Sequence, residues 1–234
     1  MNNVLHFELG ASVKNTLATF LSNHLKVTGW ALVKVSPSAK IESDLLIFSA
    51  LAGQTFGDNF GYHTLDAEGS NETLSLHTEG ISNEGGITPY FSLGCIQPSV
   101  SGGETRLFDG RKAATLIDAD PELTDVVIEY SALANPRARV RYPLVITDSD
   151  RVVRYRSKVE TNLLINSSKL SEDEVYLRVD SIIQSCLIVS HEWEAGDLLF
   201  VNNRITLHDR LPFIGRRRML RVRYNDTLNA RIRY

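Results

Sequence analysis

Residues 73–79, Thr-Leu-Ser-Leu-His-Thr-Glu, alternate polar and apolar side chains and end in a histidine two positions before a glutamate. This alternation predicts a half-buried β-strand from which His77 and Glu79 project on the same face. A further histidine, His208, lies far along the chain. Two imidazoles and one carboxylate are the ligand set of mononuclear iron(II) sites, which keep positions open for a cosubstrate and oxygen. These three residues are therefore candidate ligands of one metal ion.

A histidine two residues before a carboxylate is common by chance, so a surface strand with two polar residues would explain residues 73–79 alone. Residues toward the C-terminus support the metal hypothesis. Residues 196–204, Gly-Asp-Leu-Leu-Phe-Val-Asn-Asn-Arg, are typical of a turn that enters a buried strand, and His208 follows them. A distant strand could thus supply the third ligand.

Residues 215–224 predict a strand with two unequal faces. Leu220, Val222 and Tyr224 fall on one face, while Arg217, Met219, Arg221 and Arg223 fall on the other. Composition alone favours an exposed basic face or a nucleic-acid patch. If Arg217 and Arg221 instead point inward, an unpaired guanidinium would be costly unless a bound anion met it. A dicarboxylate would be such an anion, because arginine can bind a carboxylate with two hydrogen bonds.

Taken in order, these motifs resemble the iron(II)/2-oxoglutarate-dependent oxygenases of the taurine dioxygenase (TauD/TfdA) and clavaminate synthase group. The resemblance extends from about Gly29 to Tyr224. It is carried by His77-Thr78-Glu79, Gly102-Gly103-Glu104-Thr105, the run Gly196-Asp197-Leu198-Leu199 that leads to His208, and the pair Arg217 and Arg221.

The resemblance implies a role for each matching position. The metal ligands, which are also the catalytic residues, would be His77, Glu79 and His208. Arg217 would hold the distal carboxylate of 2-oxoglutarate, Thr105 would contribute its hydroxyl, and Arg221 would lie near the cosubstrate or the substrate.

Some positions depart from the common pattern of the family. Glu79 stands where many relatives have aspartate, as in the clavaminate synthase pattern, and Asn202 and Asp209 replace a frequent aspartate and glycine. These departures leave the substrate open. Arg154, Arg156 and Arg210 are candidates for binding a substrate carboxylate, with Arg156 and Arg210 preferred, although charged residues on strands and loops are usually solvated.

The activity implied by the resemblance uses iron(II), 2-oxoglutarate and oxygen. It would oxidise an unactivated C–H bond of a small molecule, such as an amino acid or a natural-product intermediate, and release succinate and carbon dioxide. Hydroxylation is the expected outcome, with desaturation or ring closure as the alternative. Halogenating relatives lack the carboxylate ligand, so Glu79 argues against halogenation.

Two other classes of function are compatible with parts of the sequence. Two histidines and a glutamate also describe catalytic zinc sites of hydrolases, and a jelly-roll binding module could have kept the fold without the reaction. A simple zinc hydrolase would not explain Arg217 and Arg221, because it has no dicarboxylate cosubstrate for them to bind. Retention of the three ligands together with Thr105 and Arg217 speaks against the binding module.

The expected fold is mainly β with covering helices (α+β), built on a double-stranded β-helix (jelly-roll) core. Helices are predicted over residues 12–25, 41–51 and 111–117, and another begins at Ser171, where Glu174 completes a capping box. Strands are predicted over residues 29–35, 90–96 and 151–156. Residues 57–72 are rich in Gly, Asp, Asn and Ser and predict a loop.

A chain of 234 residues with 43% hydrophobic residues is long enough for one sizeable core and short for two. We therefore expect a single oxygenase domain over residues 1–234, with N-terminal helices covering the jelly-roll. A net charge of -3 gives no general attraction to nucleic acid or to anionic membranes. No apolar run is long enough to span a bilayer, and the N-terminus lacks a signal-peptide pattern. Cys95 and Cys186 are widely separated, so a cytoplasmic protein with reduced thiols is expected. The oligomeric state is left open.

Overall fold

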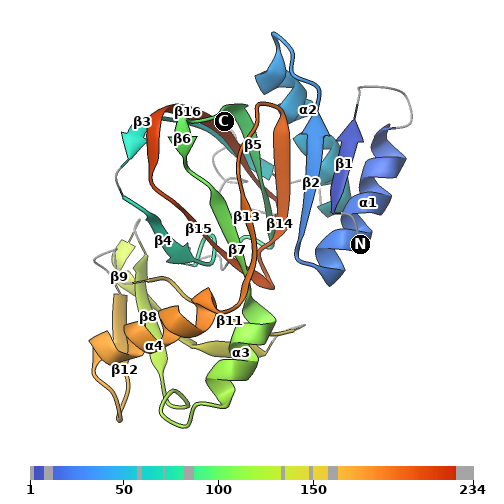
Figure 1. Ribbon diagram of the computed structural model, residues 1–234. Helices are drawn as coiled ribbons and strands as arrows, with labels where there is room; N and C mark the ends of the chain where they lie inside the picture. Colours follow the sequence, from blue (N-terminus) through green and yellow to red (C-terminus); the bar gives the residue numbers. More distant parts are fainter. Residues whose placement is uncertain are drawn as a thin grey trace.

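Two mainly antiparallel sheets form the centre of the computed structural model, which describes residues 3–7, 13–56, 60–70, 72–81, 87–132, 135–147, 150–157 and 163–224 (Figure 1). The larger sheet has the strand order β1-β2-β14-β5-β16-β3, and β6 pairs with β16. Only the pairing of β1 with β2 is parallel. Its strands are β1 (Val4–Phe7), β2 (Trp30–Val35), β3 (Phe60–Ser70), β5 (Tyr90–Gln97), β6 (Ser101–Gly102), β14 (Asp197–Asn202) and β16 (Phe213–Tyr224).

The smaller sheet faces the larger one and has the order β13-β7-β15-β4. An apolar cluster between the sheets joins Leu107 of the smaller sheet to Leu32, Phe91, Leu199 and Val201 of the larger one. The strands are β4 (Leu74–His77), β7 (Thr105–Asp109), β13 (Leu187–His191) and β15 (Thr206–Arg210). Core side chains therefore fill part of the space between the two sheets.

Two helices, α1 (Val13–Val27) and α2 (Ile41–Phe56), cover the outer face of the larger sheet (Figure 1). Apolar residues spaced four apart give α1 one buried stripe of Leu17, Leu21 and Leu25. These side chains and those of α2 share a core cluster with the apolar face of β16, formed by Leu220, Val222 and Tyr224. The predicted division of residues 215–224 into two unequal faces is confirmed.

The chain between β7 and β13 forms a second covering layer against the smaller sheet (Figure 1). Its apolar core includes Phe108 and Leu207 from that sheet. The predicted capping box is present, because Ser171 Oγ accepts from Glu174 N at 3.4 Å and Ser171 N donates to the Glu174 carboxylate at 2.9 Å. The elements are α3 (Gly110–Asp118), β8 (Val127–Ala132), β9 (Asn135–Pro143), β10 (Val145–Thr147), β11 (Arg151–Val153), β12 (Leu163–Asn166) and α4 (Glu172–Gln184).

The predicted class, mainly β with covering helices, agrees with this architecture. The loop predicted over residues 57–72 is wrong for Phe60–Ser70, which form β3 and pair with β16. Because β3 is an edge strand with mostly exposed side chains, its polar composition resembles that of a loop. Positions 12, 57–59 and 71 of the predicted segments lie outside the described residues. The strand predicted over 151–156 ends at Val153, and Arg156 then forms a single bridge with His77.

None of the described helices combines the length and the apolar composition that crossing a membrane requires. Cys95 and Cys186 are free thiols, and both are buried. Cys95 lies on β5 in the larger sheet, where burial raises the pKa of its thiol to about 12. The thiol is therefore uncharged at neutral pH.

Replacing Phe48 by alanine should destabilise the fold, because this fully buried ring lies in the layer between α2 and the larger sheet. We expect the free energy of unfolding to fall by about 3–5 kcal/mol, measured by urea denaturation. The neighbouring Ile47 on the same helix is 47% exposed, so Ile47→Ala should change stability by no more than about 0.5 kcal/mol. Equal losses in the two variants would contradict the packing described for α2.

Candidate metal and cosubstrate site

The three candidate ligands converge because β15 pairs with β4. His208 lies opposite His77 in the register of these strands, and the centroids of the two rings are 4.2 Å apart. Strand β4 ends at His77, so Glu79 lies in the turn that follows rather than on the strand itself. One ligand atom from each residue lies within 4.8 Å of the others, and all three residues are buried. The arrangement can hold a metal ion.

The ring nitrogens are oriented for coordination. His77 Nδ1 donates to the carbonyl oxygen of Ser75 at 2.7 Å, so Nε2 is the ring nitrogen that faces Glu79. The Nε2 atoms of His77 and His208 lie 3.5 and 3.7 Å from the same oxygen of Glu79, Oε2. Burial, with the charge of His77, lowers the pKa of His208 well below its usual value. His208 is thus a neutral imidazole, the form that binds a metal.

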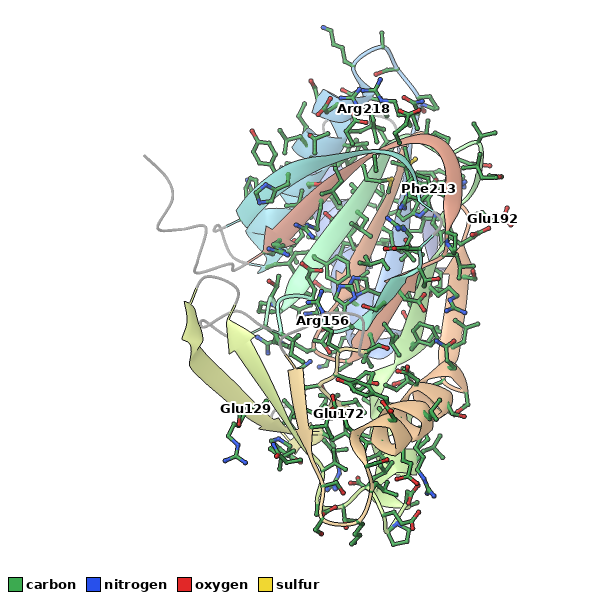
Figure 2. The ribbon with its side chains drawn as sticks, turned by 90° about the vertical axis from the view of Figure 1, so that its left-hand side faces the viewer. Glu129, Arg156, Glu172, Glu192, Phe213 and Arg218 are labelled. Atoms are coloured by element: carbon green, nitrogen blue, oxygen red, sulfur yellow. The ribbon has the colours of Figure 1, made fainter. Side chains whose placement is uncertain are left out.

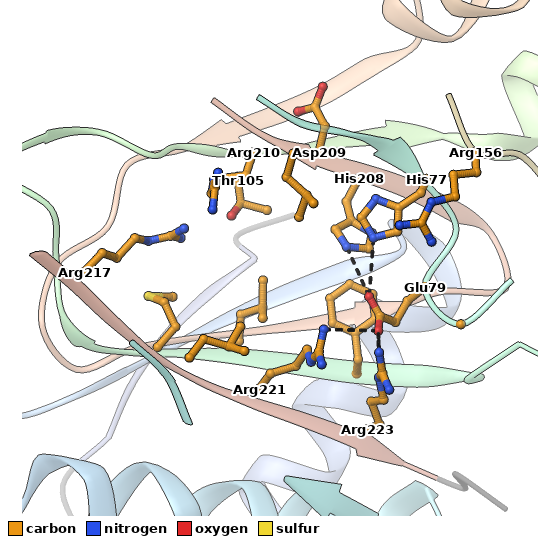
Figure 3. A pocket seen from close by; sticks show the side chains of 16 residues that line it. His77, Glu79, Thr105, Arg156, His208, Asp209, Arg210, Arg217, Arg221 and Arg223 are labelled. Carbon is orange, nitrogen blue, oxygen red and sulfur yellow. Dashed lines mark hydrogen bonds and ion pairs between the residues drawn. The ribbon is translucent and has the colours of Figure 1, made fainter. Parts of the chain in front are cut away.

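The carboxylate of Glu79 divides its two oxygens between different partners (Figure 3). Oε2 faces the imidazoles, whereas Oε1 accepts from Arg223 Nε at 2.7 Å and lies 3.6 Å from Arg221 Nη1. Burial alone would raise the pKa of Glu79, but hydrogen bonding to His77 and the charge of Arg223 hold it well below its usual value. Glu79 is therefore ionised. The sequence placed Arg223 on the polar face of the strand but did not reveal this contact.

Asn203 fixes the backbone of the Glu79 turn. Its Oδ1 accepts from Glu79 N at 2.9 Å, and its Nδ2 donates to the carbonyl oxygens of Glu79 at 2.9 Å and Thr88 at 2.6 Å. Arg154 Nη1 in turn donates to the carbonyl oxygen of Asn203 at 3.0 Å. No role for Asn203 was predicted from the sequence. A polar side chain directly after an apolar buried strand was the signal that could have identified it.

A cavity of about 400 Å³ lies beside this cluster, between the larger and the smaller sheet. It brings together all of the residues predicted for the site (Figure 3). Those residues are His77, Glu79, Thr105, Arg156, His208, Arg210, Arg217 and Arg221. Arg154, considered alongside them, is not among the lining residues, and its guanidinium serves the contact with Asn203 described above.

Arg217 lies at the end of the cavity away from Glu79 (Figure 3) and is only 7% exposed. Its guanidinium carbon lies 5.8 Å from the ring centroids of both Trp193 and Phe213. Within the described part of the chain, this guanidinium makes no ion pair or hydrogen bond. Burial, with the charge of Arg210, lowers the pKa of Arg217 to about 10, so it remains a cation at neutral pH. A buried cation in this setting suits an anionic ligand.

Thr105 lies at the same end of the cavity as Arg217 (Figure 3). Its Oγ1 accepts a hydrogen bond from Trp193 Nε1 at 3.2 Å, and the residue is buried. Because the indole is a donor only, the hydroxyl hydrogen of Thr105 can be donated to an acceptor in the cavity. Trp193 therefore contacts both Thr105 and Arg217.

The two candidate substrate residues lie at different ends of the cavity (Figure 3). Arg210 lies near Thr105 and Arg217; its guanidinium carbon is 4.8 Å from the Phe213 ring, and its Nη2 donates to the carbonyl oxygen of Glu72 at 3.1 Å. Arg156 lies beside His77, where the two backbones form a bridge. Figure 2 shows Arg156 where the large sheets meet the covering layer of β8, β9 and α4.

Asp209 follows His208 and is also buried. Its two carboxylate oxygens accept from Arg106 Nε at 2.9 Å and Nη2 at 2.5 Å. This bidentate pair joins β15 to β7. The charge of Asp209 is thus already matched by a neighbouring side chain.

A model of the family described as "Taurine catabolism dioxygenase TauD, TfdA family" matches residues 49–223. The chain belongs to this family. The resemblance stated from the sequence motifs is confirmed. No curated protein matches the sequence.

Solved structures of TauD-like oxygenases share the fold at low sequence identity. PvcB from Pseudomonas aeruginosa has a TM-score of 0.70 at 17% identity, with 94% of this chain and 84% of that chain covered. The non-haem iron oxygenase OrfP, as a mutant in complex with (3S)-hydroxy-L-arginine, has a TM-score of 0.69 at 17% identity, with coverages of 95% and 82%. An asparagine oxygenase in complex with Fe(II), 3-hydroxyasparagine and succinate has a TM-score of 0.68 at 15% identity, with coverages of 90% and 79%.

The Asn203 contacts predict that loss of this side chain lowers both stability and metal affinity, whereas loss of a comparable side chain elsewhere lowers stability alone. Asn203→Ala removes three hydrogen bonds and frees the Glu79 turn, so the affinity for iron(II) should fall about 10- to 100-fold, measured by anaerobic titration. Asn202→Ala is the matched control: Asn202 is also buried and makes two hydrogen bonds, to Leu25 O and from Arg204 N, away from the turn. Both variants should lose about 1–3 kcal/mol of stability. Similar metal affinities in the two variants would contradict the role given to Asn203.

Proposed function

We propose that this protein is an iron(II)- and 2-oxoglutarate-dependent dioxygenase that oxidises a C–H bond of a small molecule and releases succinate and carbon dioxide. Residues 1–234 form one catalytic domain, and the two large sheets are its double-stranded β-helix (jelly-roll) core. Membership of the TauD/TfdA family supports this proposal, as does the convergence of His77, Glu79 and His208 beside a cavity.

Iron(II) is bound by His77, Glu79 and His208. The donor set of two imidazoles and one carboxylate fits this ion. When bound, iron(II) supplies the oxidative chemistry that couples decarboxylation of 2-oxoglutarate to oxidation of the substrate by oxygen. The surrounding chain keeps the donors ready: Ser75 orients the His77 ring, and Asn203 holds the Glu79 turn.

Arg217 and Thr105 hold the distal carboxylate of 2-oxoglutarate. The observation that carries the function is the buried Arg217 guanidinium, which has no acidic partner in the described part of the chain and lies in the same cavity as the ligand cluster. A dicarboxylate that reaches from Arg217 to the metal gives this cation a counter-charge. A simple metal hydrolase would leave the Arg217 subsite without a ligand. Arg210 lies beside this carboxylate site, and Arg221 lies between it and Glu79 (Figure 3).

The substrate is a small molecule related to an amino acid or to a natural-product intermediate. The solved structures with the same fold include oxygenases in complex with hydroxylated arginine and asparagine, and PvcB from an isonitrile synthetic pathway. A cavity of about 400 Å³ that must also take the cosubstrate leaves room for a compact substrate. Hydroxylation is the expected reaction, and Glu79 fills the coordination position that halogenating relatives leave to chloride.

Anaerobic protein with iron(II) and 2-oxoglutarate should show a metal-to-ligand charge-transfer band in its visible absorption spectrum. His77→Ala and Glu79→Ala should lose the band and all succinate release, because each removes one of the three ligands. The absence of the band from the wild-type protein would refute the oxygenase assignment, and robust turnover by either variant would reject that residue as an iron ligand.

Arg217→Ala should weaken 2-oxoglutarate binding about 10-fold or more, as expected for the loss of a charge-assisted hydrogen bond, while iron(II) affinity changes little. The readout is an anaerobic titration of the charge-transfer band. Arg216→Ala is the matched control, since Arg216 is the preceding residue on β16 and its guanidinium pairs with Asp66 at the surface. An unaltered cosubstrate affinity in Arg217→Ala would move the carboxylate site elsewhere.

A further inference from the structure

A tryptophan lies behind the end of the cavity that Thr105 and Arg217 form (Figure 3). Trp193 Nε1 donates to Thr105 Oγ1 at 3.2 Å, and the guanidinium carbon of Arg217 lies 5.8 Å from the Trp193 ring centroid. Thr105 and Arg217 are among the described residues that line the cavity, whereas Trp193 is not. The indole would therefore act on a ligand in the cavity through these two side chains.

The turn that carries Trp193 connects β13 of the smaller sheet to β14 of the larger sheet. His191, the last residue of β13, lies opposite Thr105 in the register with β7. Its Nε2 is 3.0 Å from Oδ2 of Asp197, the first residue of β14, and the same oxygen accepts from Glu194 N at 2.9 Å. Asp197 is only 2% exposed. One buried carboxylate thus holds the two ends of the turn together.

The indole ring is packed on further sides. The His191 ring meets it edge-on, with the ring centroids 4.7 Å apart and the planes at 82°. Trp193 also packs against the apolar cluster between the sheets, which includes Phe91 and Leu199. A ring packed in this way has little room to rotate, so its N–H and its π face keep fixed directions.

These contacts orient both groups at this end of the cavity. Because the indole nitrogen is a donor only, Thr105 Oγ1 is the acceptor in their pair, and its hydroxyl hydrogen is left for another acceptor. Arginine has a long side chain with many rotamers, and the rings of Trp193 and Phe213 restrict the guanidinium of Arg217. Groups that are ordered before a ligand arrives lose less entropy when they bind it.

We propose, building on the oxygenase function, that Trp193 is a positioning residue for the cosubstrate. Its N–H orients the Thr105 hydroxyl and its ring orients the Arg217 guanidinium, and Trp193 thereby sets the affinity for the distal carboxylate of 2-oxoglutarate. Thr105 and Arg217 lie at the end of the cavity away from Glu79 (Figure 3). Loss of Trp193 should therefore weaken 2-oxoglutarate binding and leave the affinity for iron(II) near that of the wild type.

The test is a titration of 2-oxoglutarate into the anaerobic protein loaded with iron(II), followed by the charge-transfer band. Trp193→Phe keeps an aromatic ring but removes the N–H, so the affinity should fall about 3- to 10-fold, as expected for one hydrogen bond. Trp193→Leu also removes the aromatic face and should weaken binding further. Trp30→Phe is the matched control and should bind normally, since Trp30 is the other tryptophan and packs against the same apolar cluster.

A double-variant cycle separates positioning from general damage to the fold. Thr105→Val removes the hydroxyl, keeps the shape of the side chain, and should itself weaken 2-oxoglutarate binding. In the Thr105→Val background, Trp193→Phe should change the affinity by less than about 2-fold, because the hydroxyl on which the N–H acts is gone.

Three results would overturn the proposal. They are normal 2-oxoglutarate affinity in Trp193→Phe, an equal loss from this change with and without the Thr105 hydroxyl, and an equal loss in Trp30→Phe. Binding by Trp193→Leu that is no weaker than binding by Trp193→Phe would overturn the part that concerns Arg217. Absence of the charge-transfer band from the wild-type protein would instead refute the oxygenase function.

Discussion

The antiparallel pairing of β15 with β4 is the constraint on which the site depends. It places His208 opposite His77 through backbone register, so two residues far apart in sequence meet without relying on their own side chains. Glu79 comes after the end of β4, so the strand pairing does not position it. Asn203 instead holds it through hydrogen bonds to the turn. Sheet pairing therefore fixes two of the proposed ligands, and a single buried amide fixes the third.

Arginine side chains lie in two different surroundings within one cavity. At one end, the guanidinium carbon of Arg217 lies 5.8 Å from the ring centroids of Trp193 and Phe213. Around Glu79, Arg221 and Arg223 share a single carboxylate. Burying the Arg217 guanidinium has a free-energy cost, which an anion bound only by the folded protein would offset. The protein should consequently gain stability from a ligand that brings negative charge to Arg217.

Local patterns predicted much of this architecture. The pattern of residues 215–224 predicted both faces of β16, because successive side chains of a strand point to opposite faces of the sheet. The capping box at Ser171 was equally local. Strand β3 was missed because an exposed edge strand has the composition of a loop. The roles of Asn203 and Arg223 were missed because each depends on a turn more than a hundred positions away, which only the folded chain brings near.

The contacts of Trp193 at the Arg217 end of the cavity have an optical consequence. The chain has only two tryptophans, and Trp193 donates to Thr105 while its ring lies 5.8 Å from the guanidinium carbon of Arg217. The other, Trp30, lies on β2 in the larger sheet. Any anion that changes the field around Arg217 also changes the surroundings of an indole fluorophore. The protein thus carries an intrinsic emission signal for occupancy of that end, available without a label and without oxygen.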